Sequence, residues 1–286
     1  MPQITKLADP IGAEVRDVSL GSVPTPDQID LIEDALEHHG VLVFRGQSIT
    51  PAQQVAFSAA FADLEATARV EARLPGHPEI FVVGNTGKRI VSFAPADGSD
   101  DLEWHSDHMH LQTPARASLL YCRTAPPTGG DTLFACMYSA FDALTPAEQA
   151  EAEGLIAMHS VAGLQAFLRD QGAKGAADGN YAVPEDQIVR WPLVRRHPRT
   201  GRRALYFGSK VTIGIEGWPP EKARDYLTDL NVRATEPAFR YRHRWQPGDA
   251  VLWDNRRVLH AGTPFDMDRY RREMHRTTFR EDQPIA

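Results

Sequence analysis

The sequence predicts a mainly β fold with inserted helices, organised as a double-stranded β-helix, the jelly-roll barrel. Short apolar runs bounded by glycine, proline or aspartate recur along the chain, and we interpret them as strands. Helix start signals stand between some of these runs but do not alternate with them, which disfavours an α/β fold. A chain of 286 residues has the size of an undivided β-rich domain, so we expect a single domain over residues 1–286.

The amino-terminal part is predicted to contain a strand, a helix and a second strand. Residues 12–18 alternate polar and apolar side chains, which is the pattern of a half-buried strand. The segment TPDQ at 25–28 combines a capping threonine with proline and glutamine, and it predicts a helix of about 13 residues that ends near Gly40. Residues 41–44 (VLVF) form a fully apolar run, which indicates a buried strand.

Two further helices begin with the same signal, TPAQ at 50–53 and TPAE at 145–148. The three signals do not recur at a fixed period, so we infer no internal repeat. Loops are predicted at 95–101 and at 171–180, and the second of them is expected to be mobile. The other predicted elements are strands at 80–85, 118–122, 132–135, 250–253, 258–260 and 272–279, a hairpin of 192–194 with 205–207, and a helix over 220–230.

Charge and hydropathy exclude some classes of partner. The net charge is −7, and no basic block is long enough to follow a phosphate backbone, so we expect no nucleic-acid surface. No apolar run approaches the roughly 20 residues that a membrane helix needs, and the amino terminus resembles no secretion signal. These features predict a cytoplasmic protein without a membrane partner. A few local arginines could still bind a small anion.

The two cysteines, Cys122 and Cys136, are too few for a disulfide framework. Cys136 could be read as a nucleophile, but no constellation of histidine and asparagine accompanies it. We therefore interpret both cysteines as small buried hydrophobic residues.

The candidate chemistry starts at residues 104–107 (WHSD). Side chains two positions apart on a strand share a face, so His105 and Asp107 could bind the same ion. His260 would add a second imidazole and complete the two-histidine, one-carboxylate set that binds non-haem Fe(II) and leaves positions open. A histidine two residues from an aspartate is usually only a surface pair, so the residues downstream decide the interpretation.

Arg272 and Arg276 are predicted to face the same side of the last strand. Guanidinium groups are costly to bury unless each meets an anion, and their planar fork suits a carboxylate. The alternative is that both lie at a solvated edge among Arg269, Arg271 and Arg280. Spacing alone does not decide between the two.

Several motifs together resemble the family of taurine dioxygenase and 2,4-dichlorophenoxyacetate dioxygenase, which are Fe(II)/2-oxoglutarate oxygenases. The motifs are HSD at 105–107, GGDT at 129–132, WDNR at 253–256, RREMHR at 271–276, VLVFRGQ at 41–47 and YRHRW at 241–245. They cover nearly the whole chain, and the phenoxyacetate branch is the more similar one. The resemblance also implies a homo-oligomer, either a dimer or a tetramer.

The resemblance implies a role for each matching residue. Fe(II) would be held by His105, Asp107 and His260. The far carboxylate of the co-substrate 2-oxoglutarate would be bound by Thr132 and Arg272. With O2 as the second co-substrate, the reaction would release succinate and CO2 while a C–H bond of another substrate is hydroxylated. The retained Asp107 favours hydroxylation over halogenation.

Arg276 stands where the family binds the anionic group of the substrate. The spacing from His260 to Arg272 is one residue longer than the family pattern, and we expect the loop over 263–270 to absorb it. Otherwise Arg271 would take the role of Arg272. No residues match the histidine and tyrosine that help to bind a sulfonate in taurine dioxygenases, so taurine is not the expected substrate.

The expected substrate is a small organic anion resembling an aryloxyalkanoate. Hydroxylation of the carbon beside an ether oxygen gives an unstable product, so the net reaction would be ether cleavage. Alternatives within the class are an alkyl sulfate or sulfonate and an amino-acid-like natural product. Candidate walls of the substrate pocket are His108, Phe167, Lys210 and Val211.

These wall residues also have simpler interpretations. His108 and its neighbour His110 could be a solvated pair. Phe167 lies at helical spacing from two leucines, which is typical of a core position. Lys210 could be a surface amine.

Two other classes of protein remain possible from the residues. A zinc hydrolase could use the same three ligands to activate water. A β-sandwich binding module without catalysis would use none of them. The paired arginines and the GGDT turn favour the oxygenase, because a hydrolase has no need of a second anion site.

Overall fold

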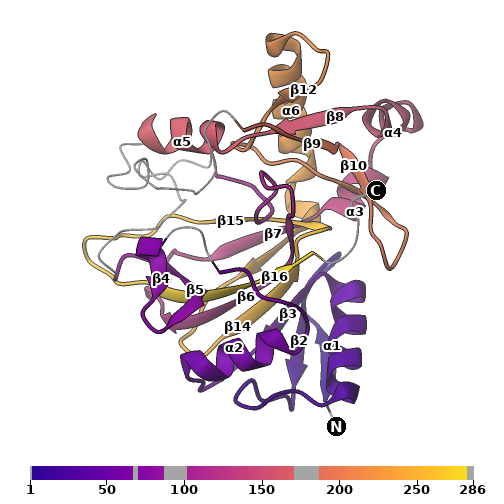
Figure 1. Ribbon diagram of the computed structural model, residues 1–286. Coiled ribbons are helices and arrows are strands. Elements are labelled where there is room, and N and C mark those ends of the chain that lie inside the picture. Colours follow the sequence, from indigo (N-terminus) through magenta and orange to yellow (C-terminus); the bar gives the residue numbers. More distant parts are fainter. Residues whose placement is uncertain (1, 67–69, 87–101, 171–186, 282–286) are drawn as a thin grey trace.

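The computed structural model describes residues 2–66, 70–86, 102–170 and 187–281. Two mainly antiparallel sheets face each other across the core, which confirms the predicted jelly-roll class (Figure 1). The larger sheet has the strand order β1-β2-β3-β14-β6-β16-β5-β4. Its strands are β1 Gln3–Lys6, β2 Ala13–Arg16, β3 Val41–Phe44, β4 Arg73–Leu74, β5 His77–Gly84, β6 Ala115–Thr124, β14 Ala250–Asp254 and β16 Glu273–Arg280.

The second barrel sheet has the order β13-β7-β15. A three-stranded sheet β12-β8-β9 and a hairpin β10-β11 lie beyond it, with α5 and α6 nearby (Figure 1). The strands of these sheets are β7 Thr132–Cys136, β8 Ile156–His159, β9 Val189–Pro192, β10 Val194–Arg196, β11 Arg203–Leu205, β12 Thr212–Ile215, β13 Arg240–His243 and β15 Val258–Gly262. The helices are α1 Pro26–His39, α2 Pro51–Ala59, α3 Met137–Asp142, α4 Pro146–Glu153, α5 Val161–Asp170 and α6 Pro220–Ala234.

Alternation along the strands creates two packing layers, because successive side chains point to opposite faces of a sheet. In β3, Val41 and Val43 belong to the cluster between the two sheets, whereas Leu42 and Phe44 belong to the cluster on the outer face. Helices α1 and α2 cover that outer face (Figure 1). The inner layer is therefore the place where side chains from both sheets can meet.

The predicted helix starts are confirmed at α1, α2 and α4. Each has a threonine cap that accepts from the backbone N–H three residues on, while that residue's side chain reaches back to the cap. Helix α1 ends at Gly40, whose φ of +70° is a left-handed conformation that glycine adopts readily. The predicted hairpin forms as well, with Val194 paired to Leu205.

The prediction of a strand carrying both His105 and Asp107 is wrong. His105 makes only an isolated bridge, and Asp107 begins a turn. Strands β1, β4, β8, β9, β12 and β13 were not predicted, because short or partly polar strands carry a weak period-two signal. The predicted loops at 95–101 and 171–180 lie outside the described residues. Within the described part of the chain, no helix is long and apolar enough to cross a membrane.

Candidate metal and co-substrate site

Three potential metal ligands converge where the 105–107 segment meets β15. The main chains of His105 and His260 exchange two hydrogen bonds: His260 N–H donates at 2.8 Å and His105 N–H donates at 3.1 Å. Asp107 follows in the adjoining turn. One ligand atom from each residue lies within 4.8 Å of the other two. The bridge between two distant segments, and not a shared strand face, brings the ligands together.

The surroundings of the two imidazoles determine which nitrogens can bind a metal. Nδ1 of His105 lies 2.9 Å from the carbonyl oxygen of Glu103, so in the neutral ring Nδ1 carries the proton and Nε2 keeps a lone pair. Nε2 of His260 lies 4.0 Å from Oδ2 of Asp107. Burial lowers the pKa of His260 well below its ordinary value and keeps the ring neutral. Neutral imidazole is the form that binds metal ions.

The carboxylate of Asp107 is held in its ionised form. Burial raises its pKa, but the positive charge of Arg276, joined at low pH by the protonated histidines nearby, outweighs burial and lowers the pKa below the ordinary range. Oδ2 accepts a hydrogen bond from Ser118 Oγ at 2.6 Å, and Oδ1 accepts one from Arg276 Nη1. Two imidazole nitrogens and one anionic oxygen donor form a set that fits non-haem Fe(II).

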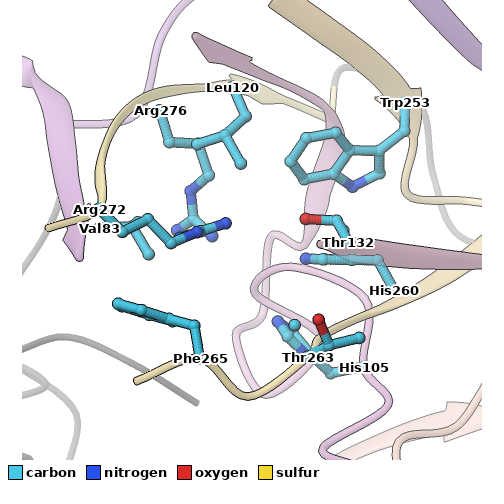
Figure 2. Close-up of a pocket in the computed structure, with 11 residues that line it drawn as sticks. Val83, His105, Leu120, Thr132, Trp253, His260, Thr263, Phe265, Arg272 and Arg276 are labelled. Atoms are coloured by element: carbon cyan, nitrogen blue, oxygen red, sulfur yellow. The ribbon is translucent and has the colours of Figure 1, made fainter. Parts of the chain in front are cut away.

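A small cavity, partly open to solvent, lies beside these ligands (Figure 2). Apolar side chains of the larger sheet and of Phe265, after β15, make up much of its wall. Two arginines enter it from β16 and from the residue just before that strand. The lining residues are Val83, His105, Leu120, Thr132, Trp253, His260, Gly262, Thr263, Phe265, Arg272 and Arg276.

Arg272 immediately precedes β16, and its side chain lines the cavity. Its Nε donates to the carbonyl oxygen of Gly130 at 3.1 Å. Burial lowers the pKa of the guanidinium to about 10, and the negative charge of Asp131 offsets only part of this effect. Asp131 itself accepts a hydrogen bond from Arg242 at 2.6 Å. A buried cation in this environment gains more from an incoming carboxylate than an exposed arginine would.

Thr132 lies opposite, at the start of β7. Its Oγ1 accepts a hydrogen bond from the indole N–H of Trp245 at 2.9 Å. Because that contact uses an oxygen lone pair, the hydroxyl proton of Thr132 can be donated to another group. Thr132 and Arg272 thus offer an O–H and an N–H donor to the same cavity (Figure 2).

The loop before β16 determines which arginine enters the cavity. Asn85 Nδ2 donates to the carbonyl oxygens of Met267 and Tyr270, at 3.0 and 2.9 Å, and Asn85 Oδ1 accepts from the main-chain N–H of Arg272 at 2.9 Å. Arg271 is exposed, and its Nη1 donates to the Met267 carbonyl at 3.0 Å. The side chain inside the cavity is that of Arg272.

Arg276 also lines the cavity, although it contacts a metal ligand as well. Its Nη1 donates to Asp107, and its guanidinium carbon lies 5.0 Å from the ring centre of Phe81. Its Nε is buried and has no hydrogen-bond partner among the described residues. The two arginines therefore do not lie at a solvated edge, and Arg276 retains an unused donor.

Of the other predicted wall residues, His108, Lys210 and Val211 do not line this cavity. His108 adopts a φ of +58°, and its ring centre is 6.5 Å from that of His110. Burial lowers the pKa of His108 to about 3 and that of His110 to about 4, so neither is a solvated imidazole. Both rings are neutral near physiological pH.

Val211 packs against Met109 and Tyr206 in a separate apolar cluster, and Lys210 precedes it in the same turn. The backbone of Phe167 lies in α5, and its side chain lies outside the described residues. Sequence reasoning missed Ser118 and several apolar lining residues. A strand signal marks such positions as buried but does not distinguish a cavity wall from the core.

Comparisons with known proteins agree with this geometry. The family model "Taurine catabolism dioxygenase TauD, TfdA family" matches residues 3–278. The alpha-ketoglutarate-dependent 2,4-dichlorophenoxyacetate dioxygenase of Cupriavidus pinatubonensis is 37% identical over 282 residues, which cover 96% of each chain. The (S)-phenoxypropionate/alpha-ketoglutarate-dioxygenase of Sphingobium herbicidovorans is 34% identical over 278 residues, which cover 94% of this chain and 91% of the relative. The solved structure of AAD-2 in complex with Mn(II) and N-oxalylglycine matches with a TM-score of 0.82 and 30% identity over 100% of both chains.

The jelly-roll fold, the two histidines with one aspartate and these relatives define a class, the 2-oxoglutarate-dependent dioxygenases with non-haem iron. The chain belongs to the TauD/TfdA family of this class. The predicted family, enzyme class and co-substrates are thereby confirmed. The hydrolase and binding-module interpretations find no support.

Proposed function

We propose that this enzyme hydroxylates a small organic anion, an aryloxyalkanoate-like carboxylate, with release of succinate and CO2. The observation that carries the proposal is the pair of arginines, Arg272 and Arg276, that line one cavity beside the metal ligands. One guanidinium suits the co-substrate and leaves the other for a second anion. The similarity to aryloxyalkanoate dioxygenases supports the same conclusion.

His105, Asp107 and His260 would hold the iron, which when bound supplies oxidative decarboxylation of 2-oxoglutarate by O2. Arg272 and Thr132 would bind the far carboxylate of 2-oxoglutarate through an ion pair and a hydroxyl hydrogen bond. N-oxalylglycine, the ligand of AAD-2, carries two carboxylates at a similar separation, which supports this assignment.

The substrate carboxylate would meet Arg276 on the metal side of the cavity. The Nε of this residue has no partner among the described residues, and its Nη1 contacts the metal ligand Asp107. An anion bound there would keep its neighbouring C–H bonds close to the metal. The apolar side chains of Val83, Leu120 and Phe265 would exclude water from the same space.

Succinate formation from 2-oxoglutarate, with Fe(II) and O2, tests the substrate class. Each candidate is added separately: phenoxyacetate, the two 2-phenoxypropionate enantiomers, an alkyl sulfate and taurine. We expect an aryloxy acid to stimulate succinate release most, and taurine to have no effect. Stimulation by the alkyl sulfate alone would show that the substrate is a sulfate ester and not a carboxylate, because a guanidinium also binds sulfate.

Arg276→Met is expected to raise the substrate KM by about 100-fold, because a charge-assisted pair with the substrate carboxylate is lost. Phenoxyacetamide, the neutral isostere of phenoxyacetate, provides the control. Wild type should discriminate strongly between acid and amide, and the variant should treat them almost alike. A variant that keeps the wild-type preference for the acid would show that another residue binds the carboxylate.

We also propose that the enzyme is cytoplasmic and forms a homo-oligomer, either a dimer or a tetramer. Both cysteines are free and buried, which suits a reducing compartment. The oligomer is supported by the family resemblance. Residues 1–286 are proposed to form a single dioxygenase domain, and the family match over 3–278 supports that extent.

A further inference from the structure

A buried hydrogen-bond network surrounds the carboxylate of Asp107. The hydroxyl of Ser118, on β6, donates to Oδ2 of Asp107 at 2.6 Å. The side-chain amide of Asn255 donates to Ser118 Oγ at 3.0 Å, and its Oδ1 accepts from the main-chain N–H of Asp107 at 3.1 Å. Ser118, Asp107 and Asn255 are each no more than 3% exposed.

Asn255 links this network to other parts of the site. Its Oδ1 also accepts from the indole N–H of Trp253 at 2.9 Å, and Trp253 lines the cavity. Its main-chain oxygen accepts from Ser106 Oγ at 2.6 Å. Asn255 lies in the turn between β14 and β15, and β15 carries His260. Asn255 therefore contacts the segment that supplies His105 and Asp107, and it stands three residues before the strand that supplies His260.

The direction of each hydrogen bond gives the network its chemical effect. Because the amide of Asn255 donates to Ser118 Oγ, the serine proton is free to point at Asp107. Because Asn255 Oδ1 accepts from the N–H of Asp107, the backbone that carries the carboxylate is fixed as well. Without these contacts, only the hydrogen bond from Arg276 Nη1 to Oδ1 would oppose rotation of the carboxylate.

We propose that Ser118 and Asn255 are positioning residues for the metal ligand Asp107. Ser118 fixes the carboxylate oxygen nearer to His260, and Asn255 orients both the serine hydroxyl and the Asp107 backbone. Groups that orient a metal ligand commonly change metal affinity by about 10- to 100-fold. The inference rests on the proposed iron site, and it concerns how tightly a divalent ion is held before any co-substrate binds.

The test is the Kd of Mn(II) for the metal-free protein, measured by calorimetry without 2-oxoglutarate. Ser118→Ala is expected to weaken Mn(II) binding by about 10- to 100-fold, and Ser118→Thr, which keeps the hydroxyl, should recover most of the loss. Ser58→Ala is the matched control. Ser58 is also a fully buried serine, and its hydroxyl contacts Thr277 Oγ1 at 2.7 Å, away from the metal ligands. Its loss should leave the Mn(II) Kd unchanged.

Thermal unfolding separates positioning from general destabilisation. Ser58→Ala removes one buried hydrogen bond and Ser118→Ala removes two, so the melting temperature should fall in both variants and further in Ser118→Ala. Only Ser118→Ala should also lose Mn(II) affinity. If Ser118→Ala does not fold, Asn255→Ala is the second variant, with the same expected loss of affinity.

Wild-type Mn(II) affinity in folded Ser118→Ala would overturn the positioning role while the proposed function stands. Equal weakening in Ser58→Ala and Ser118→Ala would overturn it too, because the effect would then be general. Failure of wild type itself to bind Mn(II) would overturn both the inference and the proposed metal site.

Discussion

His105→Ala is expected to abolish succinate formation from 2-oxoglutarate while the protein stays folded. The side chain supplies one of three ligand atoms that lie within 4.8 Å of one another, and the remaining two residues would hold a divalent ion weakly. Its loss removes the hydrogen bond from Nδ1 to the Glu103 carbonyl, and a bond of this kind contributes about 1 kcal/mol to folding. That cost is small compared with the roughly 5–15 kcal/mol that stabilises a typical domain.

The measurement combines succinate release, iron content and circular dichroism on the same preparations. His38→Ala is the control, because His38 is an exposed histidine on α1. That helix covers the outer face of the larger sheet, away from the three proposed metal ligands. It should retain full activity and iron. Full turnover in folded His105→Ala would show that the proposed metal site is not needed for the reaction.

Arg272→Met is expected to raise the KM for 2-oxoglutarate by about 100-fold. A charge-assisted hydrogen-bonded pair with a carboxylate is commonly worth about 1.5–3 kcal/mol, and burial places Arg272 at the upper end of that range. Arg271→Met is the matched control, since it removes the same charge from the adjacent, exposed position. The control should leave the KM unchanged. If Arg271→Met raised the KM and Arg272→Met did not, Arg271 would be the residue that binds 2-oxoglutarate.

The melting temperature gives a second test of Arg272→Met, because it should not fall even though the affinity for 2-oxoglutarate does. Burial lowers the pKa of this guanidinium to about 10, so the charge is poorly compensated in the folded protein without co-substrate. Replacing such a group by an apolar side chain of similar length should not lower the melting temperature. A combined loss of stability and affinity would indicate that Arg272 is mainly a structural residue.

Local signals predicted much of the fold. The three TPxQ or TPxE segments start helices because proline and the capping pair satisfy the free N–H groups at a helix start, and this needs no tertiary contact. The run VLVF became β3 for a similarly local reason, since β-branched and aromatic residues suit a buried strand. The exposed first strand, QITK, carries too little apolar content to be seen.

The three residues of the proposed metal site could be named from the sequence, but the way the fold assembles them could not. His105 and Asp107 were assigned to a strand, whereas a bridge to His260 positions the first and a turn positions the second. A contact between residues 155 positions apart has no local signature. The same reason hides Ser118 and Asn255, whose hydrogen bonds to Asp107 depend on how β6 and β14 pair.

The most direct test of the dioxygenase assignment follows the oxygen atoms. The enzyme is incubated with Fe(II), 2-oxoglutarate, a stimulating aryloxy acid and isotopically labelled O2, and the succinate is analysed by mass spectrometry. The account predicts one labelled oxygen atom in each succinate, because oxidative decarboxylation places one atom of O2 in the new carboxylate. Succinate without label, or no succinate from folded, iron-loaded protein, would contradict it.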